Sequence, residues 1–182
     1  MENQIVRKKT SQANAKDVAV SGLLIAMVFT ATMFINIRLP LSMNGGLIHM
    51  GNVMLFLASF IFDKKKGAIA GAFGMGMFDI LSGWAAWAPF TFIVRGLMGY
   101  IAGSISNHKG KSGSSFALNL LAIVVSGLWM VVGYYFTEVI LYGNWITPMT
   151  SIPGNISQLV IGLFALIITP AVKKLNISGG RS

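Results

Sequence analysis

The stretch GAIAGAFGMGMFDILSGWAAWAPFTFIVRGLMGYIAG, residues 67–103, decides the fold. Two apolar, glycine-rich segments flank a turn that contains two tryptophans and a proline. Each segment carries one charge, Asp79 in the first and Arg95 in the second. A charge inside an apolar span costs roughly 3 kcal/mol or more, so such residues usually pair and often mark a functional interior. We therefore expect two packed membrane helices whose two charges pair with each other, with or without contact to a ligand.

The composition is that of an integral membrane protein. Of the 182 residues, 54% are hydrophobic and 10% are charged, whereas a soluble domain carries about 25% charged residues. The net charge of +9 does not indicate nucleic-acid binding, because the basic residues form short clusters between apolar runs. Cysteine is absent, which excludes disulfides and cysteine-based metal sites. We expect residues 1–182 to form one membrane domain in a cell membrane, in contact with the lipid bilayer.

The apolar runs predict an all-α protein with six transmembrane helices, since runs of roughly 17 to 25 residues are long enough to cross a bilayer. The predicted spans cover about 17–35, 47–62, 68–82, 89–105, 116–142 and 155–172. Twelve of the fourteen lysines and arginines lie in the N-terminal tail, the turn 63–66, the loop 106–115 and the C-terminal tail. These four segments fall on one side of a six-span topology, so both termini are predicted to be cytoplasmic.

Polar side chains from five predicted helices reach the same level, near the outer membrane surface. A helix rises about 1.5 Å per residue, so the depth of each polar group follows from its position in its span. The inner half of the bundle has almost no polar groups apart from Asn119. A pocket open to the outside needs polar groups at one end only, whereas an ion path needs them at every depth. The candidate ligand contacts are His49, Asn52, Asp79, Trp84, Trp87, Arg95, Tyr134, Glu138, Asn155 and Gln158.

Each candidate also has a simpler structural role. His49 and Asn52, three residues apart, are expected on one face of a helix, where the histidine could bond a neighbouring helix. Glu138 could be solvated among the lipid headgroups. The tryptophans, Trp145 included, could form an interfacial aromatic belt or stack on a flat heteroaromatic ring. Asn155 and Gln158 offer amide donors and acceptors to a hydroxyl or a ring nitrogen.

Several catalytic motifs are absent from the sequence. There is no GxxxxGK[ST] phosphate-binding loop, no HExxH zinc motif and no GxSxG nucleophile elbow. No cofactor or metal is expected. An intramembrane enzyme that uses Asp79, Glu138 and His49 is one alternative, although no nucleophile accompanies them. A stand-alone secondary transporter is the other alternative, and it would need coupling to an ion.

Residues 48–103, IHMGNVMLFLASFIFDKKKGAIAGAFGMGMFDILSGW…WAPFTFIVRGLMGYIAG, resemble a known family. The matching features are the H-x-G-[ND] pattern from His49 to Asn52, the basic-glycine turn at Lys66 and Gly67, an acidic residue at Asp79 and a basic one at Arg95. They resemble the substrate-binding S components of energy-coupling factor (ECF) vitamin transporters. The similarity is to the riboflavin-type group and its HmpT-like members, which are assigned to hydroxymethylpyrimidine or vitamin B6 uptake.

This resemblance implies a division of labour within a bacterial plasma membrane. The S component would capture a vitamin in an outward-facing pocket, closed by the loop 36–46. It would dock onto a membrane coupling (T) subunit through small residues of the first span, and two cytoplasmic ATPase subunits would supply the energy. The chain itself would be neither an enzyme nor an ATPase. The docking residues on this reading are Ala15, Ala19, Gly22 and Ala26.

The predicted pocket is small, aromatic and mixed in charge, with one acid-base pair together with a histidine and amides. It lacks several unpaired arginines, so a multiply anionic ligand such as a folate or a nucleotide is not expected. A small neutral or zwitterionic ring suits the pocket better, which favours pyridoxine or hydroxymethylpyrimidine. Riboflavin and pantothenate stay open as alternative ligands.

Overall fold

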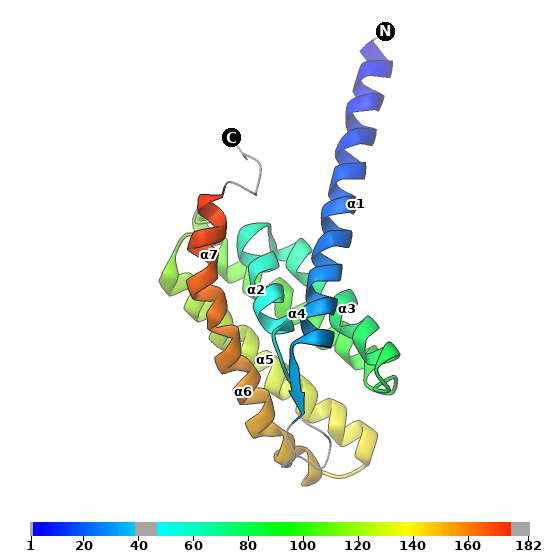
Figure 1. Cartoon of the computed structure of the whole chain (residues 1–182), viewed down its shortest axis with the longest axis vertical. Helices are drawn as coiled ribbons and strands as arrows, with labels where there is room; N and C mark the ends of the chain where they lie inside the picture. Colours follow the sequence, from blue (N-terminus) through cyan, green and yellow to red (C-terminus); the bar gives the residue numbers. More distant parts are fainter. Residues whose placement is uncertain (1, 39–46, 176–182) are drawn as a thin grey trace.

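Seven α-helices dominate the computed structural model, which describes residues 2–38 and 47–175 (Figure 1). A two-stranded sheet and two short 3-10 helices complete the described residues. In chain order the elements are α1 (Glu2–Phe34), β1 (Asn36–Arg38), β2 (Leu47–His49), α2 (Gly51–Ile61), α3 (Lys64–Leu81), α4 (Ala88–Ser106), η1 (His108–Gly110), α5 (Phe116–Tyr142), η2 (Thr147–Ser151), α6 (Ile152–Gly162) and α7 (Phe164–Lys174).

Within the described residues, four helical segments are long and apolar enough to cross a membrane, namely Ala15–Phe34, Ala88–Ser106, Phe116–Tyr142 and Thr147–Lys174. They correspond to four of the six predicted spans. The other two predicted spans are α2 and α3, so the count of six stays a prediction. At about 1.5 Å per residue, α2 is roughly 16 Å long, about half the hydrocarbon thickness of a bilayer.

The short helix α2 lies at the centre of the bundle (Figure 1). Ten of its eleven residues are buried, and its rings Phe56 and Phe60 stack on each other with centroids 5.7 Å apart. A helix that is apolar all round is expected to be surrounded by protein. The surrounding helices therefore have a fixed core to pack on, and the polar end of α2 is held at a defined place.

The glycine-rich hairpin of α3 and α4 packs backbone against backbone. A Cβ atom at Gly99 would lie 2.3 Å from the carbonyl oxygen of Gly67, and one at Gly71 would lie 2.7 Å from the carbonyl oxygen of Arg95. Only residues without a side chain allow this approach. The close packing that the sequence predicts for 67–103 is therefore present.

The start of the predicted second span, 47–62, is wrong. Leu47–His49 forms β2, which pairs antiparallel with β1 through Asn36↔His49, Ile37↔Ile48 and Arg38↔Leu47. The backbone N–H of Met50 then bonds to the carbonyl of Ile35, at 3.0 Å, and helix α2 begins only at Gly51. His49 and Asn52 consequently do not share a helical face. The predicted lid, 36–46, begins with β1, and its residues 39–46 lie outside the described residues.

Two other helix boundaries differ from the prediction. Helix α1 begins at Glu2 and continues through the segment predicted as a polar tail. The last predicted span, 155–172, is two helices, α6 and α7, which meet at Leu163 through backbone bonds between residues three apart. The N-terminal end of α1 and the C-terminal end of α7 lie toward the same end of the molecule, and the strand hairpin lies at the opposite end (Figure 1).

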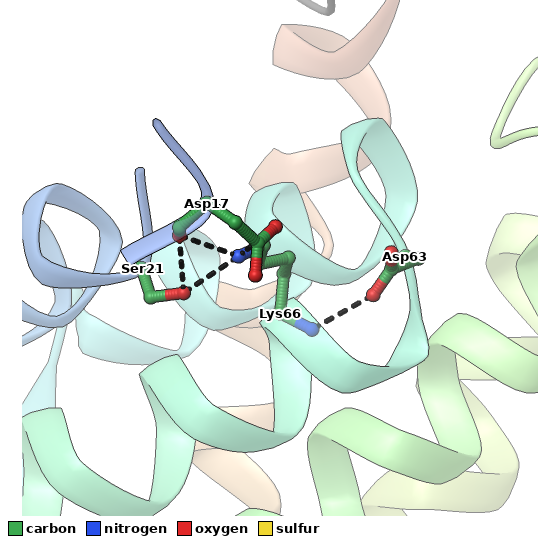
Figure 2. A network of polar contacts seen from close by, with 4 residues as sticks. All are labelled: Asp17, Ser21, Asp63 and Lys66. Carbon is green, nitrogen blue, oxygen red and sulfur yellow. Dashed lines mark hydrogen bonds and ion pairs between the residues drawn. The ribbon is translucent and has the colours of Figure 1, made fainter. Parts of the chain in front are cut away.

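A buried lysine joins α1 to α3 (Figure 2). The ammonium group of Lys66 pairs with the Asp17 carboxylate at 2.7 Å and donates to the Ser21 hydroxyl at 2.6 Å. The Asp63 carboxylate accepts from the backbone N–H of Lys66 at 2.8 Å and so caps the start of α3. We call this the basic end of the bundle, since Lys64, Lys65, Lys66 and the lysines of 106–115 and α7 belong to the segments that meet there.

Candidate functional site

A cavity opens at the end of the bundle that carries the strand hairpin, opposite the basic end. It holds about 100 Å³ of free space, several times the roughly 10–15 Å³ that one water molecule needs. Nine of the ten predicted ligand contacts line it, and Asn52 is the exception. The depth argument from the sequence therefore brings nine of these residues to one cavity, and their role as ligand contacts stays a prediction.

The floor of this cavity is organised by Arg95, whose side chain is 3% exposed. Its guanidinium group donates to Asn52 Oδ1 at 2.5 Å, to Gln158 Oε1 at 2.8 Å and to Tyr134 Oη at 3.0 Å. The sulfur of Met130 lies 2.9 Å from Nη1 of the same group. Residues of α2, α5 and α6 thus converge on one side chain of α4. Asn52 does not line the cavity, and it contributes to the floor by accepting a hydrogen bond from Arg95.

The predicted ion pair between Asp79 and Arg95 is wrong. Every hydrogen bond that Arg95 donates to a side chain goes to an uncharged partner. Asp79 lies two residues before the end of α3, whereas Arg95 is seven residues into α4 and points toward α2, α5 and α6. The Asp79 carboxylate instead lines the wall of the cavity, as does Thr91 of α4. Both charges therefore face the cavity as separate groups.

A second carboxylate, that of Glu138, closes another side of the cavity. Glu138 is 6% exposed, and its Oε2 atom accepts a hydrogen bond from the Ser151 hydroxyl at 2.8 Å. This burial rules out the alternative in which Glu138 is solvated among lipid headgroups. The neighbouring hydroxyls of Thr91 and Tyr134 lie 3.1 Å apart and join the wall formed by α4 to the wall formed by α5.

His49 lines the cavity and carries a buried nitrogen without a hydrogen-bond partner in the described part of the chain. The side chain is 5% exposed, and its Nδ1 atom has no hydrogen-bond partner among the described residues. Leaving a buried polar atom without a partner costs roughly 1–3 kcal/mol. This nitrogen lies beside the backbone of Gly51, and the imidazole as a whole stays a predicted ligand contact.

Tryptophans form the aromatic part of the cavity lining. The rings of Trp84 and Trp87 meet edge to face with centroids 5.2 Å apart, and Trp87 also packs against Tyr142 at 5.9 Å. Trp145 does not reach the cavity, since it is 61% exposed and packs on Tyr135 and Phe136. Trp84 and Trp87 therefore line the cavity and Trp145 does not, while stacking on a ligand and an interfacial belt stay predictions.

Six further residues line the cavity and were missed by the sequence prediction: Thr32, Leu47, Met75, Phe78, Thr91 and Ser151. Thr91 lies one helical turn before Arg95, so the i, i+4 spacing could have identified it. Ser151 belongs to η2, whose short irregular backbone gives no periodic signal. Leu47 reaches the site because β2 is a strand, which the pattern of the apolar run did not reveal.

The predicted docking residues lie on one face of α1. Ala15, Ala19, Gly22 and Ala26 are all exposed, and a Cβ atom added at Gly22 would meet nothing within 4 Å. Their spacing of four, three and four residues keeps them on one stripe of the helix. The stripe is therefore unoccupied by the rest of the described chain, and its role as a docking face stays a prediction.

Comparison with known proteins identifies the family. The model of the family described as "ECF-type riboflavin transporter, S component" matches residues 12–176. The thiamine precursor transporter HmpT of Lactococcus lactis subsp. cremoris (strain MG1363) is 26% identical over 174 residues, which cover 95% of this chain and 97% of that protein. An uncharacterized protein of Pyrococcus woesei is 33% identical over 144 residues, which cover 79% of this chain and 85% of that protein.

A solved structure shows the same fold. It is described as "Structure and mechanism of the S component of a bacterial ECF transporter", with a TM-score of 0.69 and 20% identity over 90% of this chain and 99% of that one. The resemblance that the sequence suggested for 48–103 is confirmed and extends over nearly the whole chain. The chain belongs to the ECF-type riboflavin transporter S component family, as a multi-pass membrane subunit for vitamin uptake and not an enzyme.

Proposed function

We propose that this S component captures a small heteroaromatic vitamin precursor, hydroxymethylpyrimidine or pyridoxine, in the cavity above Arg95. The observation that carries the proposal is the chemistry of the lining. Two carboxylates, Asp79 and Glu138, accept hydrogen bonds, the imidazole of His49 offers one more polar contact, and two tryptophans offer ring faces. An aminopyrimidine combines N–H donors, ring-nitrogen acceptors and a flat face, and it matches this set. Pyridoxine offers hydroxyls and a pyridine nitrogen instead.

The hydrogen bonds that Arg95 already makes within the protein argue against an anionic ligand. Its donors are already directed to Asn52, Gln158 and Tyr134, so it has little capacity left for a ligand carboxylate. Pantothenate would bring its carboxylate near Asp79 and Glu138, where like charges repel. The relative named as a thiamine precursor transporter supports the pyrimidine in particular.

Riboflavin is the second candidate, because the matching family model carries its name. Its three fused rings and ribityl chain need more room than a single substituted ring. The free space of about 100 Å³ therefore favours the smaller ligands. A binding measurement on the purified protein distinguishes riboflavin from the single-ring ligands.

The test is isothermal titration of the purified protein with hydroxymethylpyrimidine, pyridoxine, thiamine, riboflavin and pantothenate. We expect the tightest binding, with a dissociation constant below micromolar, for one of the first two. The variant His49→Ala should weaken that binding about tenfold, since it removes a buried contact worth roughly 1–1.5 kcal/mol. Tightest binding of riboflavin would refute the choice of ligand, and no binding of any of the five would refute the proposed function.

We further propose that the stripe Ala15, Ala19, Gly22 and Ala26 docks onto a membrane coupling subunit, which two ATPase subunits energise. Small residues at this spacing let two membrane helices approach closely. The cavity would then face the outside and the basic end the cytoplasm, as the charge distribution favours. Gly22→Leu should abolish co-purification of the coupling subunit and leave vitamin binding unchanged. Met27→Leu, on the same helix, is the matched control. Uptake that persists in cells without any ATPase partner would refute this arrangement.

A further inference from the structure

A second cavity lies near the basic end of the bundle, between the beginning of α5 and the end of α7. Its volume is about 220 Å³. Ser114, Asn119 and Lys173 form its polar side, and Phe116 and Leu166 form its apolar side. The segment that joins α4 to α5 passes beside α7 at this place (Figure 1), and Lys173 donates hydrogen bonds to the carbonyl of Ser112 and to the Ser114 hydroxyl. The cavity is separate from the vitamin site.

Basic side chains outnumber acidic ones in the segments around this cavity. From residue 80 to the end of the sequence the only acidic residue is Glu138, which lines the other cavity. Lys109, Lys111, Lys173 and Lys174 all belong to the segments that meet here. The first-turn N–H groups of α5, which begins at Phe116, also favour an anion.

The position along the helices matches the level of lipid headgroups. Phe116 begins one candidate membrane span, and Lys174 ends another. The two helices that line the cavity also carry exposed apolar side chains, since Phe116 of α5 is 65% exposed, and Phe164 and Ile167 of α7 are 52% and 73% exposed. A ligand that carries an anionic group next to hydrocarbon would satisfy both sides of the cavity at once.

We propose that this cavity binds the headgroup of an anionic membrane phospholipid. Lys173 contacts the lipid phosphate, and an acyl chain follows the apolar side past Phe116 and Leu166. Basic pockets between membrane helices bind anionic headgroups through the same combination of charge and apolar surface. The site would fix one lipid at the junction of α5, α7 and the loop between α4 and α5.

The experiment is native mass spectrometry of the full chain, released from detergent that contains equal amounts of phosphatidylglycerol and phosphatidylcholine. The wild-type protein should retain phosphatidylglycerol in preference. Lys173→Gln should weaken this retention about fivefold, since a basic side chain contributes about 1 kcal/mol to binding of anionic lipid. Lys174→Gln is the matched control, because it removes the same charge next to the cavity without lining it, and it should change retention less than twofold.

A second variant separates the cavity from the charge. Ser114→Leu fills the polar side without altering any charge, and it should also reduce phosphatidylglycerol retention at least fivefold. Equal retention of the two lipids, or equal loss in the two lysine variants, would overturn the proposal in favour of general surface attraction. Displacement of the lipid by millimolar inorganic phosphate would indicate a free-anion site instead and overturn it as well. Vitamin titration of the same variants should be unchanged, so the outcome does not depend on the vitamin site.

Discussion

Replacing Arg95 with methionine tests the organisation of the cavity floor. The change removes hydrogen bonds to Asn52, Gln158 and Tyr134, and it leaves their buried oxygens without this donor. A hydrogen bond to a charged group contributes about 1.5–3 kcal/mol, and the loss is offset in part because no charge is buried any longer. We therefore expect a loss of about 3 kcal/mol, which lowers the melting temperature by roughly 6–12 °C for a chain of this size.

The variant Asp79→Asn provides the contrast. Asp79 makes no ion pair with Arg95, and it lies on the cavity wall, where an amide of the same shape can take its place. We expect this variant to cost less than about 1 kcal/mol, in line with ordinary substitutions outside buried networks. The measurement is thermal unfolding in detergent, in the absence of vitamin.

Double-mutant cycles give the decisive result. The coupling free energy between Arg95 and Asn52 should be about 1–3 kcal/mol, as for residues in one hydrogen-bond network. The coupling between Arg95 and Asp79 should stay below about 0.5 kcal/mol. If the Asp79 variant instead restored the stability of Arg95→Met, the two charges would form the pair that the sequence suggested. The floor described above would then be refuted.

Three further predictions concern the rim, the basic end and the helix hairpin. Trp84→Ala should weaken vitamin binding about threefold to tenfold in titration, from the loss of a ring contact worth about 0.5–1.5 kcal/mol, whereas Trp145→Ala should leave it unchanged. Lys66→Ala should lower the melting temperature by several degrees, since it removes the buried side chain whose hydrogen bonds join α3 to α1; exposed Lys65→Ala is its control and should have no effect. Gly99→Ala should prevent accumulation of folded protein in the membrane, because its Cβ would lie 2.3 Å from a backbone oxygen of α3.

The parts of the site that could be predicted from sequence are those that depend on depth alone. A helix advances by a fixed rise per residue, so Asp79, Tyr134 and Glu138 could be placed at one level without knowing how the helices pack. The close approach of α3 and α4 was likewise predictable, because the glycines repeat on the faces that meet. The depth of a residue in the membrane and the ability of a glycine-lined helix to approach its neighbour both follow from the sequence of a single span.

The partner of Arg95 could not be predicted in this way. Several acceptors share its level, and a long side chain selects among them by direction, which only the packed bundle defines. The strand at Leu47–His49 was missed for a related reason. A short apolar run is compatible with helix or strand, and its pairing partner, β1, is separated from it by the segment 39–46.

The hydrogen bonds of Gln158 connect Arg95 with the strand β2. Its Oε1 atom accepts from Arg95 at 2.8 Å, and its Nε2 group donates to the carbonyl of Leu47 in β2. One buried amide on α6 therefore holds both the floor of the cavity and the strand beside its opening. Because the arginine and this amide satisfy each other, they are expected to position the site, while Asp79, Glu138 and His49 discriminate between ligands. On this argument a Gln158→Ala variant loses affinity for every ligand alike, whereas a His49→Ala variant changes the ratio between the pyrimidine and the pyridine.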